Sequence, residues 1–235
     1  MPLFDLQKLG KIEEGIFIDR PNRFVGLCQI DKKVVKCHIA DPGRLKELLT
    51  KNRKIFAVKN PKGYKTDYKL VAVESDKEII LLNTSIHSKI GYEAIKNGVL
   101  GFYPEKIKKE VTFGKSRIDY LINDKIFVEL KGCNLKSEAK CLFPDAPTKR
   151  GEKHLKELIE AVNKGYQAYI LILILRECTC FSPNFKLDKN FSNTFVKALS
   201  RGVKFRAFKI KIKNFKIFLE KEIPLCENIL QKRKS

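Results

Sequence analysis

Residues 110–132, EVTFGKSRIDYLINDKIFVELKG, contain two short runs of alternating apolar residues on either side of a polar turn, with carboxylates inside the runs. Apolar side chains occupy the even positions of 118–122 and of 126–131, which is the two-residue period of a β-strand. Asp119, Glu129 and Lys131 occupy odd positions and would lie on the opposite face. The residues between the two runs, 123–125, are typical of a turn. The stretch therefore predicts a hairpin with charged side chains inside its strands.

The register of this hairpin determines how the charges meet. An odd-numbered loop centred on Asp124 places Asp119 opposite Glu129, whereas a two-residue turn would pair Asp119 with Val128 and mismatch the faces. Opposed Cβ atoms lie ~4.5–5.5 Å apart, so two carboxylates there repel each other. A hard divalent cation such as Mg²⁺ binds carboxylates and substrate phosphates and would remove the repulsion. The hairpin thus predicts a metal and phosphate site; the alternative is a solvated charged face.

Composition limits the class of protein. The chain has 235 residues and a net charge of +21, which indicate one large or two small domains and a polyanionic partner, most simply nucleic acid. The alternative is a lysine-rich composition that reflects thermal adaptation. Seven cysteines without a C-x-x-C pair indicate neither a disulfide framework nor a zinc site. Without a secretory pattern or a membrane-length apolar run, we expect a cytoplasmic protein that does not bind membranes.

Residues 1–84 contain several short strand-like runs, which predict a small β-barrel. The runs are 15–18, 24–30, 33–39, 55–59, 68–74 and 79–82. Residues 41–49 are expected to form one helix, with Asp41 as its N-cap and Pro42 as its first residue. If Tyr64 and Tyr68 are exposed among the lysines, the barrel can bind single strands by stacking and phosphate contacts. The alternative is a purely structural module.

Residues 85–235 alternate helical and strand-like patterns and predict a mixed sheet with helices on both sides. We expect helices at 85–97, from Thr148 to Gly165 and at 191–200, and strands at 106–113, 116–122, 126–131, 167–175, 203–210 and 211–219, the last at an edge. Residues 133–147 are expected to be mostly irregular, and 231–235 disordered.

Two helices add candidate site residues. Glu93 lies beside the apolar stripe of the helix at 85–97 and is a candidate third carboxylate. Arg150, Lys153 and His154 lie near the start of the next helix, where positive charge opposes the helix dipole. That conflict indicates an anionic ligand. The alternative is a solvated basic face on which His154 packs locally.

An aspartate on one strand followed by Glu-x-Lys on the next resembles the restriction-endonuclease-like nuclease superfamily. A closer resemblance covers nearly the whole chain. Its segments are DPGRL (41–45), NT (83–84), SRIDY (116–120), VELK (128–131) and FPDAPTKRGEKHL (143–155), and together they resemble the sugar fermentation stimulation protein family. The resemblance implies an α+β protein with an OB-fold nucleic-acid-binding domain at 1–84 and a nuclease-type α/β domain at 85–235. It also implies DNA binding and, in enteric bacteria, regulation of maltose metabolism.

We therefore expect a DNA endonuclease without sequence specificity. Asp119, Glu129 and Glu93 would hold one or two Mg²⁺ or Mn²⁺ ions, and Lys131 would neutralise charge on the scissile phosphate. The residues expected to contact nucleic acid are Arg44, Lys115, Arg117, Arg150, Lys153 and His154. Two alternatives remain open: a non-catalytic DNA-binding regulator, and an RNA-binding or RNA-processing module. No small-molecule cofactor is expected, and the sequence leaves monomer and homodimer open.

Overall fold

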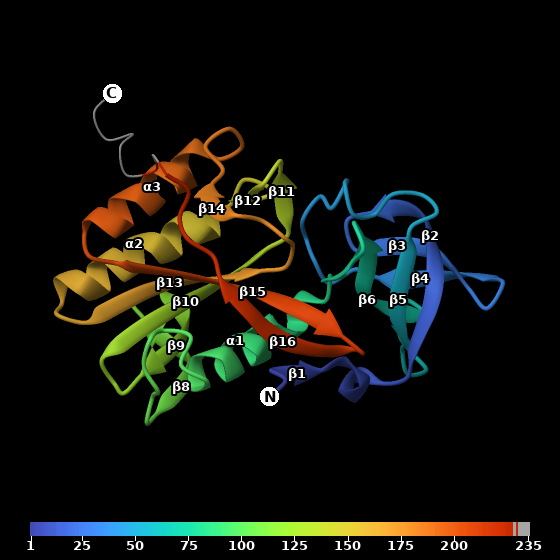
Figure 1. Cartoon of the computed structure of the whole chain (residues 1–235), viewed down its shortest axis with the longest axis horizontal. Helices are drawn as coiled ribbons and strands as arrows, with labels where there is room; N and C mark the ends of the chain where they lie inside the picture. The colour runs from blue at the N-terminus through green and yellow to red at the C-terminus, as the bar shows by residue number, and fades with distance from the viewer. Residues whose placement is uncertain (228, 230–235) are drawn as a thin grey trace. The chain divides into compact units, whose positions relative to one another are not determined.

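The structure, a computed structural model, describes residues 1–227 and 229, so the expected disorder at 231–235 lies outside the described residues. Contacts within the chain divide it into two compact units (Figure 1). The first comprises residues 1–87 and 211–219, and the second comprises 88–210 and 220–235. None of the helices in the described part is long and apolar enough to cross a membrane.

The first unit contains the expected small barrel. Its strands are β2 (Ile12–Asn22), β3 (Val25–Ile30), β4 (Lys33–His38), β5 (Lys54–Lys59) and β6 (Tyr68–Ser75). They pair in the order β4-β3-β2-β5-β6, and β4 also pairs with β6, so the sheet closes on itself. β7 (Glu78–Leu81) adds to β6. Alternate residues of β3 and β4, among them Cys28, Ile30 and Cys37, are buried inside the barrel.

Two expectations for the barrel are wrong. Residues 41–49 form turns rather than a helix, because the Asp41 carboxylate accepts a hydrogen bond from the N–H of Gly43 (2.8 Å) in an Asx turn. Leu45 then adopts a φ of 51°, which a right-handed helix excludes. Tyr68 is buried rather than exposed, and its hydroxyl donates to Glu13 (3.1 Å).

A mixed seven-stranded sheet forms the centre of the C-terminal part, as expected. Its strands are β1 (Phe4–Asp5), β8 (Ile107–Phe113), β9 (Ser116–Ile122), β10 (Ile126–Cys133), β13 (Gln167–Ile174), β15 (Lys204–Lys213) and β16 (Lys216–Glu222), in the order β1-β16-β15-β13-β10-β9-β8. β10, β13 and β15 run parallel, whereas β8, β9 and β10 are antiparallel. The edge strand expected at 211–219 is wrong, because these residues hold the end of β15, a turn at 214–215 and the start of β16. β16 also pairs with β1 and therefore does not lie at the edge.

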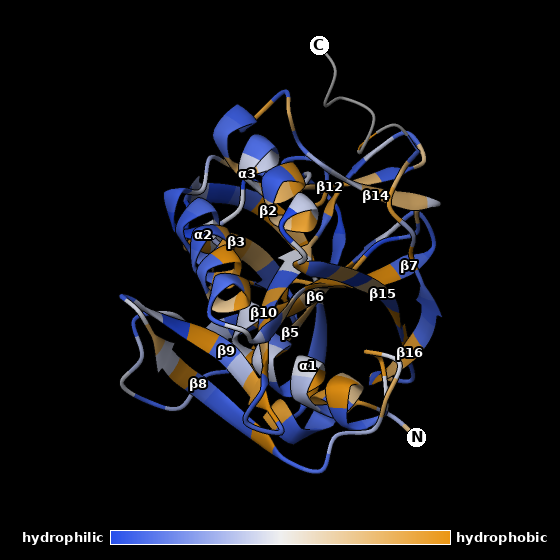
Figure 2. Cartoon of the chain, turned by 90° about the vertical axis from the view of Figure 1, so that its left-hand side faces the viewer, coloured by the Kyte–Doolittle hydropathy of each residue, from blue (hydrophilic) through white to orange (hydrophobic). Residues whose placement is uncertain are grey.

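Helices cover both faces of this sheet. α2 (Lys149–Asn163) and α3 (Lys189–Ser200) lie side by side on one face (Figure 1). α1 (His87–Lys96), which follows the short 3-10 turn Thr84–Ile86, packs on the other through Gly91, beside Tyr120 and Leu130. Hydrophobic residues recur along α2 and α3 among hydrophilic ones in Figure 2, as amphipathic helices require. Seven of the eight residues of β13 are buried, which fits a strand covered on both faces.

Residues 133–147 are more regular than the sequence predicts. β11 (Leu135–Ser137) and β12 (Lys140–Phe143) form a small sheet with β14 (Cys180–Pro183). Disulfides link Cys141 to Cys178 and Cys180 to Cys226, so the expectation of no disulfide framework is wrong. The bonded cysteines are 37 and 46 residues apart, and short-range cysteine spacing carries no signal for such pairs.

Candidate metal and phosphate site

The site begins at the β9–β10 hairpin, whose register matches the prediction. Ile122 pairs with Ile126, and Tyr120 pairs with Val128. Asn123 and Asp124 have positive φ values of 49° and 55°, which asparagine and aspartate tolerate better than other non-glycine residues. The loop therefore has the predicted odd length centred on Asp124.

Beyond Tyr120, a side chain replaces the main-chain pairing. The N–H of Leu130 donates to Asp119 Oδ2 (2.7 Å), which holds this carboxylate between the two strands. Burial raises the pKa of Asp119 to about 6, and the negative charge of Glu129 adds to the effect. The hydrogen bond from Leu130 acts in the opposite direction. Glu129 is thus close enough to Asp119 for its charge to disfavour the ionisation of Asp119.

Glu129 is buried, with 1% of its surface exposed. Lys131 Nζ lies 2.5 Å from Glu129 Oε1, and His154 Nδ1 contacts the same oxygen. Burial acts to raise the pKa of Glu129, but the hydrogen bond with His154 and the charge of Lys131 outweigh it and hold the pKa below its usual range. Glu129 Oε2 is also buried, and no described residue forms a hydrogen bond with it. Glu129 is therefore an anion with one oxygen available to a ligand.

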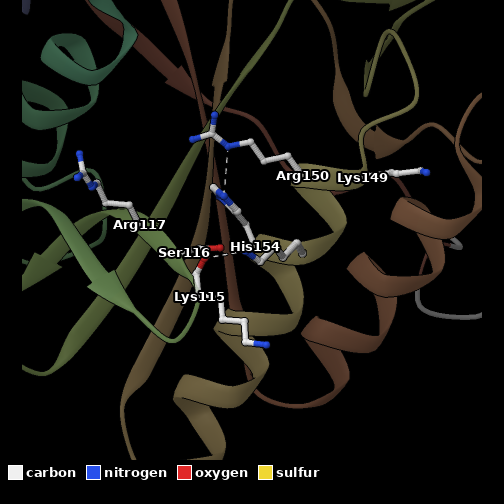
Figure 3. A pocket seen from close by; sticks show the side chains of 7 residues that line it. Lys115, Ser116, Arg117, Lys149, Arg150 and His154 are labelled. Carbon is white, nitrogen blue, oxygen red and sulfur yellow. Dashed lines mark hydrogen bonds between the residues drawn. The ribbon is translucent and has the colours of Figure 1, made fainter.

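Helix α2 supplies His154. The hydroxyl of Thr148 caps the helix by accepting from the N–H of Gly151 (3.0 Å), as the sequence predicts. His154 belongs to the buried stripe of α2, which turns its ring toward β10. Arg150 Nε lies 3.4 Å from His154 Nε2 (Figure 3). An arginine can only donate, so this contact assigns the ring proton to Nδ1, which then donates to Glu129.

A basic pocket of about 400 Å³ adjoins His154 (Figure 3). It is lined by Lys115, Ser116, Arg117, Lys149, Arg150, Lys153 and His154. The β8–β9 turn supplies one side of the pocket and the start of α2 supplies the other. Lys153 Nζ donates to the carbonyl of Lys115 (2.7 Å) and joins the two sides. Five cationic side chains around one pocket fit an anion such as phosphate.

Five of the six residues expected to contact nucleic acid line this pocket. The sequence reasoning missed Ser116 and Lys149, although each is adjacent to a predicted residue. The sixth, Arg44, lies in the first unit with an exposed side chain, and its carbonyl accepts from Arg20 (2.5 Å). The pocket therefore gathers basic residues that lie more than thirty positions apart in the sequence.

Glu93 lies on α1, the helix on the other face of the sheet from α2. Asp119 is electrostatically affected by Glu129, Lys131 and His154, and α1 packs on the face that carries Tyr120 and Leu130. Among the residues that the structure describes, no group of three or more His, Cys, Asp or Glu side chains is arranged to hold a metal ion. Glu93 as a third metal ligand stays a prediction.

The barrel closes as an OB fold, and the mixed sheet carries an Asp and a Glu-x-Lys on paired strands. The fold therefore defines a protein with an OB domain followed by a restriction-endonuclease-like domain. Residues 18–82 match the family described as "SfsA N-terminal OB domain", and 85–216 match "Sugar fermentation stimulation protein RE domain". The chain belongs to this sugar fermentation stimulation protein (SfsA) family.

Relatives of similar length support this membership. The homologue from Sulfurisphaera tokodaii is 43% identical and the one from Thermosipho melanesiensis 37%. The alignments cover 93% of this chain and 92% of the first relative, and 95% of this chain and 98% of the second. The solved structure of Pyrococcus furiosus SfsA in complex with Ca²⁺ is also similar, with a TM-score of 0.85 and 30% identity over 96% of this chain and 99% of that one.

Proposed function

We propose that this protein is a divalent-metal-dependent phosphodiesterase that cuts nucleic acid, most simply DNA, without sequence specificity. The observation that carries the proposal is Glu129 Oε2, a buried carboxylate oxygen without a hydrogen-bond partner in the described residues. Lys131 and His154 contact the other oxygen, Oε1, and a buried polar atom without a partner is costly. Asp119 lies close enough for its charge to interact with that of Glu129, and a metal ion bound by both would meet this requirement.

The donor set fits a hard cation. Asp119 and Glu129 would hold Mg²⁺ or Mn²⁺, which bind one or two carboxylates and complete their coordination with water and substrate phosphate. Pyrococcus furiosus SfsA is described as a complex with Ca²⁺, another cation that takes oxygen ligands. A bound metal would supply an activated water molecule and polarise the phosphate.

The chain's own residues would position the substrate. Lys131, whose side chain is 17% exposed beside Glu129, would neutralise charge that develops on the scissile phosphate. His154 would hold Glu129 in place through Oε1 and leave Oε2 to the metal. Arg117, Arg150 and the other cations of the basic pocket would bind a neighbouring phosphate. Such contacts fix the position of a strand without reading its bases.

A non-catalytic DNA-binding regulator is the second candidate, because no group of three or more His, Cys, Asp or Glu side chains in the described residues is arranged to hold a metal ion. It would retain the basic pocket but cut nothing. The family name suggests that such a regulator would act on sugar-metabolism genes.

The test is cleavage of plasmid, single-stranded DNA and single-stranded RNA by the full chain with Mn²⁺ or with EDTA. The matched variant is Asp119→Asn, which keeps an acceptor for Leu130 N–H but removes the charge. Lys186→Ala, an exposed lysine outside the basic pocket, is the control. We expect cutting that requires metal and is lost only in Asp119→Asn. Equal background cutting in all three proteins would overturn the proposal, and binding without cutting would favour the regulator.

A further inference from the structure

The outer face of β2, β3 and β4 carries a mixed apolar and basic surface. Strand register aligns three rows across it: Ile16, Gln29 and Val34; Asp19, Leu27 and Lys36; and Asn22, Val25 and His38. Cys28 and Cys37, between these rows, are buried in the barrel, so the rows face outward. Ile16 is 38% exposed and Val34 65%. The barrel thus leaves apolar side chains uncovered beside Lys36.

Two exposed aromatic residues project from loops that are fastened to β4. Phe24, 50% exposed, lies in the β2–β3 turn, and its carbonyl accepts from the N–H of Ile39 at the end of β4 (2.8 Å). Tyr64, 65% exposed, lies in the β5–β6 loop. The base of that loop is held by Asp67, whose N–H donates to the carbonyl of Lys36 (2.8 Å) and whose carboxylate accepts from the N–H of Lys36 (2.8 Å).

The tip of the β5–β6 loop is open. A Cβ added at Gly63, next to Tyr64, would meet no heavy atom within 4 Å. At the base of the loop, the side chain of Asn60 donates to the carbonyl of Thr66 (2.9 Å). The base is therefore held by hydrogen bonds, whereas the tip is open. The ring of Tyr64 is therefore available to a flat partner without rearrangement of the barrel.

The charge around this surface is positive. Arg23 is adjacent to Phe24, Lys62 and Lys65 flank Tyr64, and Lys32, Lys33 and Lys36 lie on or beside β4, against the acidic residues Asp19, Asp31 and Asp67. Exposed aromatic rings among cations are the means by which proteins bind single strands, because bases stack on the rings and phosphates meet the cations. In OB folds the corresponding face and its two flanking loops bind oligonucleotides.

We propose that this surface, the outer face of β2–β4 with Phe24 and Tyr64, binds single-stranded nucleic acid. The inference rests on the proposed function in taking nucleic acid as the ligand, and it adds the strand state and the residues that recognise it. In a duplex the base faces are stacked on one another and cannot meet Phe24 or Tyr64. DNA and RNA single strands present the same faces and phosphates, so the surface accepts both.

The experiment measures affinity by fluorescence anisotropy with the full chain in EDTA, so that no strand is cut. The probes are labelled oligothymidylate and oligouridylate of about 20 nucleotides, longer than the roughly 4–16 that one OB fold covers. A duplex of the same length is the competitor. We expect Phe24→Ala and Tyr64→Ala each to weaken binding about 5- to 50-fold. Tyr64→Phe, which keeps the ring, and Tyr103→Ala, which removes an 80% exposed tyrosine of the second unit, should bind like the wild type.

Two results would overturn the inference: wild-type affinity in both alanine variants, or equally effective competition by the duplex. Unchanged melting temperatures exclude a folding defect, and retained binding by Tyr64→Phe assigns the effect to the ring. The proposed function fails separately. If Asp119→Asn cuts as well as the wild type while the aromatic variants lose affinity, only the phosphodiesterase is wrong. If cutting requires Asp119 but Phe24→Ala and Tyr64→Ala bind single strands as tightly as the wild type, only the single-strand surface is wrong.

Discussion

The backbone N–H of Leu130 donates to the carboxylate of Asp119 at 2.7 Å, in the place where a main-chain partner would continue the β9–β10 ladder. This contact fixes Asp119 on the protein itself, so no ligand is needed to orient it. The partly buried carboxylate still has a raised pKa, about 6, because burial and Glu129 disfavour its charge. The charge on Asp119 is therefore unfavourable at neutral pH unless a cation compensates it.

Replacing Asp119 with asparagine should stabilise the metal-free protein above pH 6. Between about pH 4 and 6 the folded state binds the Asp119 proton more tightly than the unfolded state, so wild-type stability falls as pH rises through this window. The asparagine side chain of the variant does not ionise and escapes this loss. A rise from 3.8 to about 6 corresponds to at most about 3 kcal/mol. Urea unfolding in EDTA at several pH values measures the difference.

Well below pH 3.8, the gain in Asp119→Asn should vanish, because the wild-type carboxyl group is then protonated in both the folded and the unfolded state. A gain that is the same at pH 4 and pH 8 would show that lost charge is not its cause. Asp124→Asn is the control, since Asp124 is exposed at the hairpin turn and its pKa is lowered by Lys108 and Lys106. That substitution should not stabilise the protein at any pH.

Replacing His154 should weaken metal binding without removing a ligand. His154 contacts Glu129 Oε1, and its loss leaves Lys131 alone to orient that carboxylate. Partners that orient a metal ligand typically contribute about 10- to 100-fold in affinity. We expect a loss of this size for Mn²⁺ in His154→Ala, measured by calorimetry. Lys156→Ala, on the exposed face of the same helix, should bind Mn²⁺ like the wild type; equal losses in both variants would point to damage of α2.

Removing Arg150 should reduce the salt dependence of nucleic-acid binding. Arg150 lines the basic pocket, and each lost phosphate contact lowers the slope of log affinity against log salt by about 1. Arg150→Ala should show this change for every sequence tested, because phosphate contacts carry no sequence information. Lys186→Ala retains the full pocket and should leave the slope unchanged. An unaltered slope in Arg150→Ala would show that the basic pocket does not bind nucleic-acid phosphates.

The two disulfides should stabilise the second unit. Closing loops of 37 and 46 residues restricts the unfolded chain, and each bond contributes roughly 3–4 kcal/mol in the chain-entropy description. A reductant should therefore lower the denaturation midpoint, and Cys180→Ser should lose part of that sensitivity. Alkylation of the unfolded, unreduced protein should label Cys28, Cys37 and Cys133 alone. Labelling of all seven cysteines without a reductant would contradict the disulfides.

The hairpin register could be predicted because it depends on local information. A two-residue period, matching faces and one polar turn were enough to fix the pairing around Asp124. The burial of Glu129 could not be predicted from the hairpin, because it depends on α2, whose His154 is 25 residues away. Its signal was the apolar stripe of that helix, which includes His154.

The turn at 41–49, the disulfides and the small β11-β12-β14 sheet could not be predicted from local sequence. The Asp41 carboxylate accepts from the N–H of the residue two positions later and forms an Asx turn. As an N-cap it would instead accept from an N–H of the first turn of a helix. The same local sequence is compatible with the Asx turn and with the helix. The disulfides and the β11-β12-β14 sheet join segments some forty residues apart, so neither propensity nor spacing indicates them. The disulfides and the small sheet were therefore missed because they depend on contacts between residues far apart in the sequence.

The central claim is that Asp119 and Glu129 share a divalent cation, and anomalous diffraction from crystals grown with Mn²⁺ tests it most directly. The account predicts a manganese peak bonded to Glu129 Oε2 and to the Asp119 carboxylate, absent from crystals of Asp119→Asn. Manganese bound only elsewhere, or Asp119 and Glu129 turned apart with no ion between them, would contradict it.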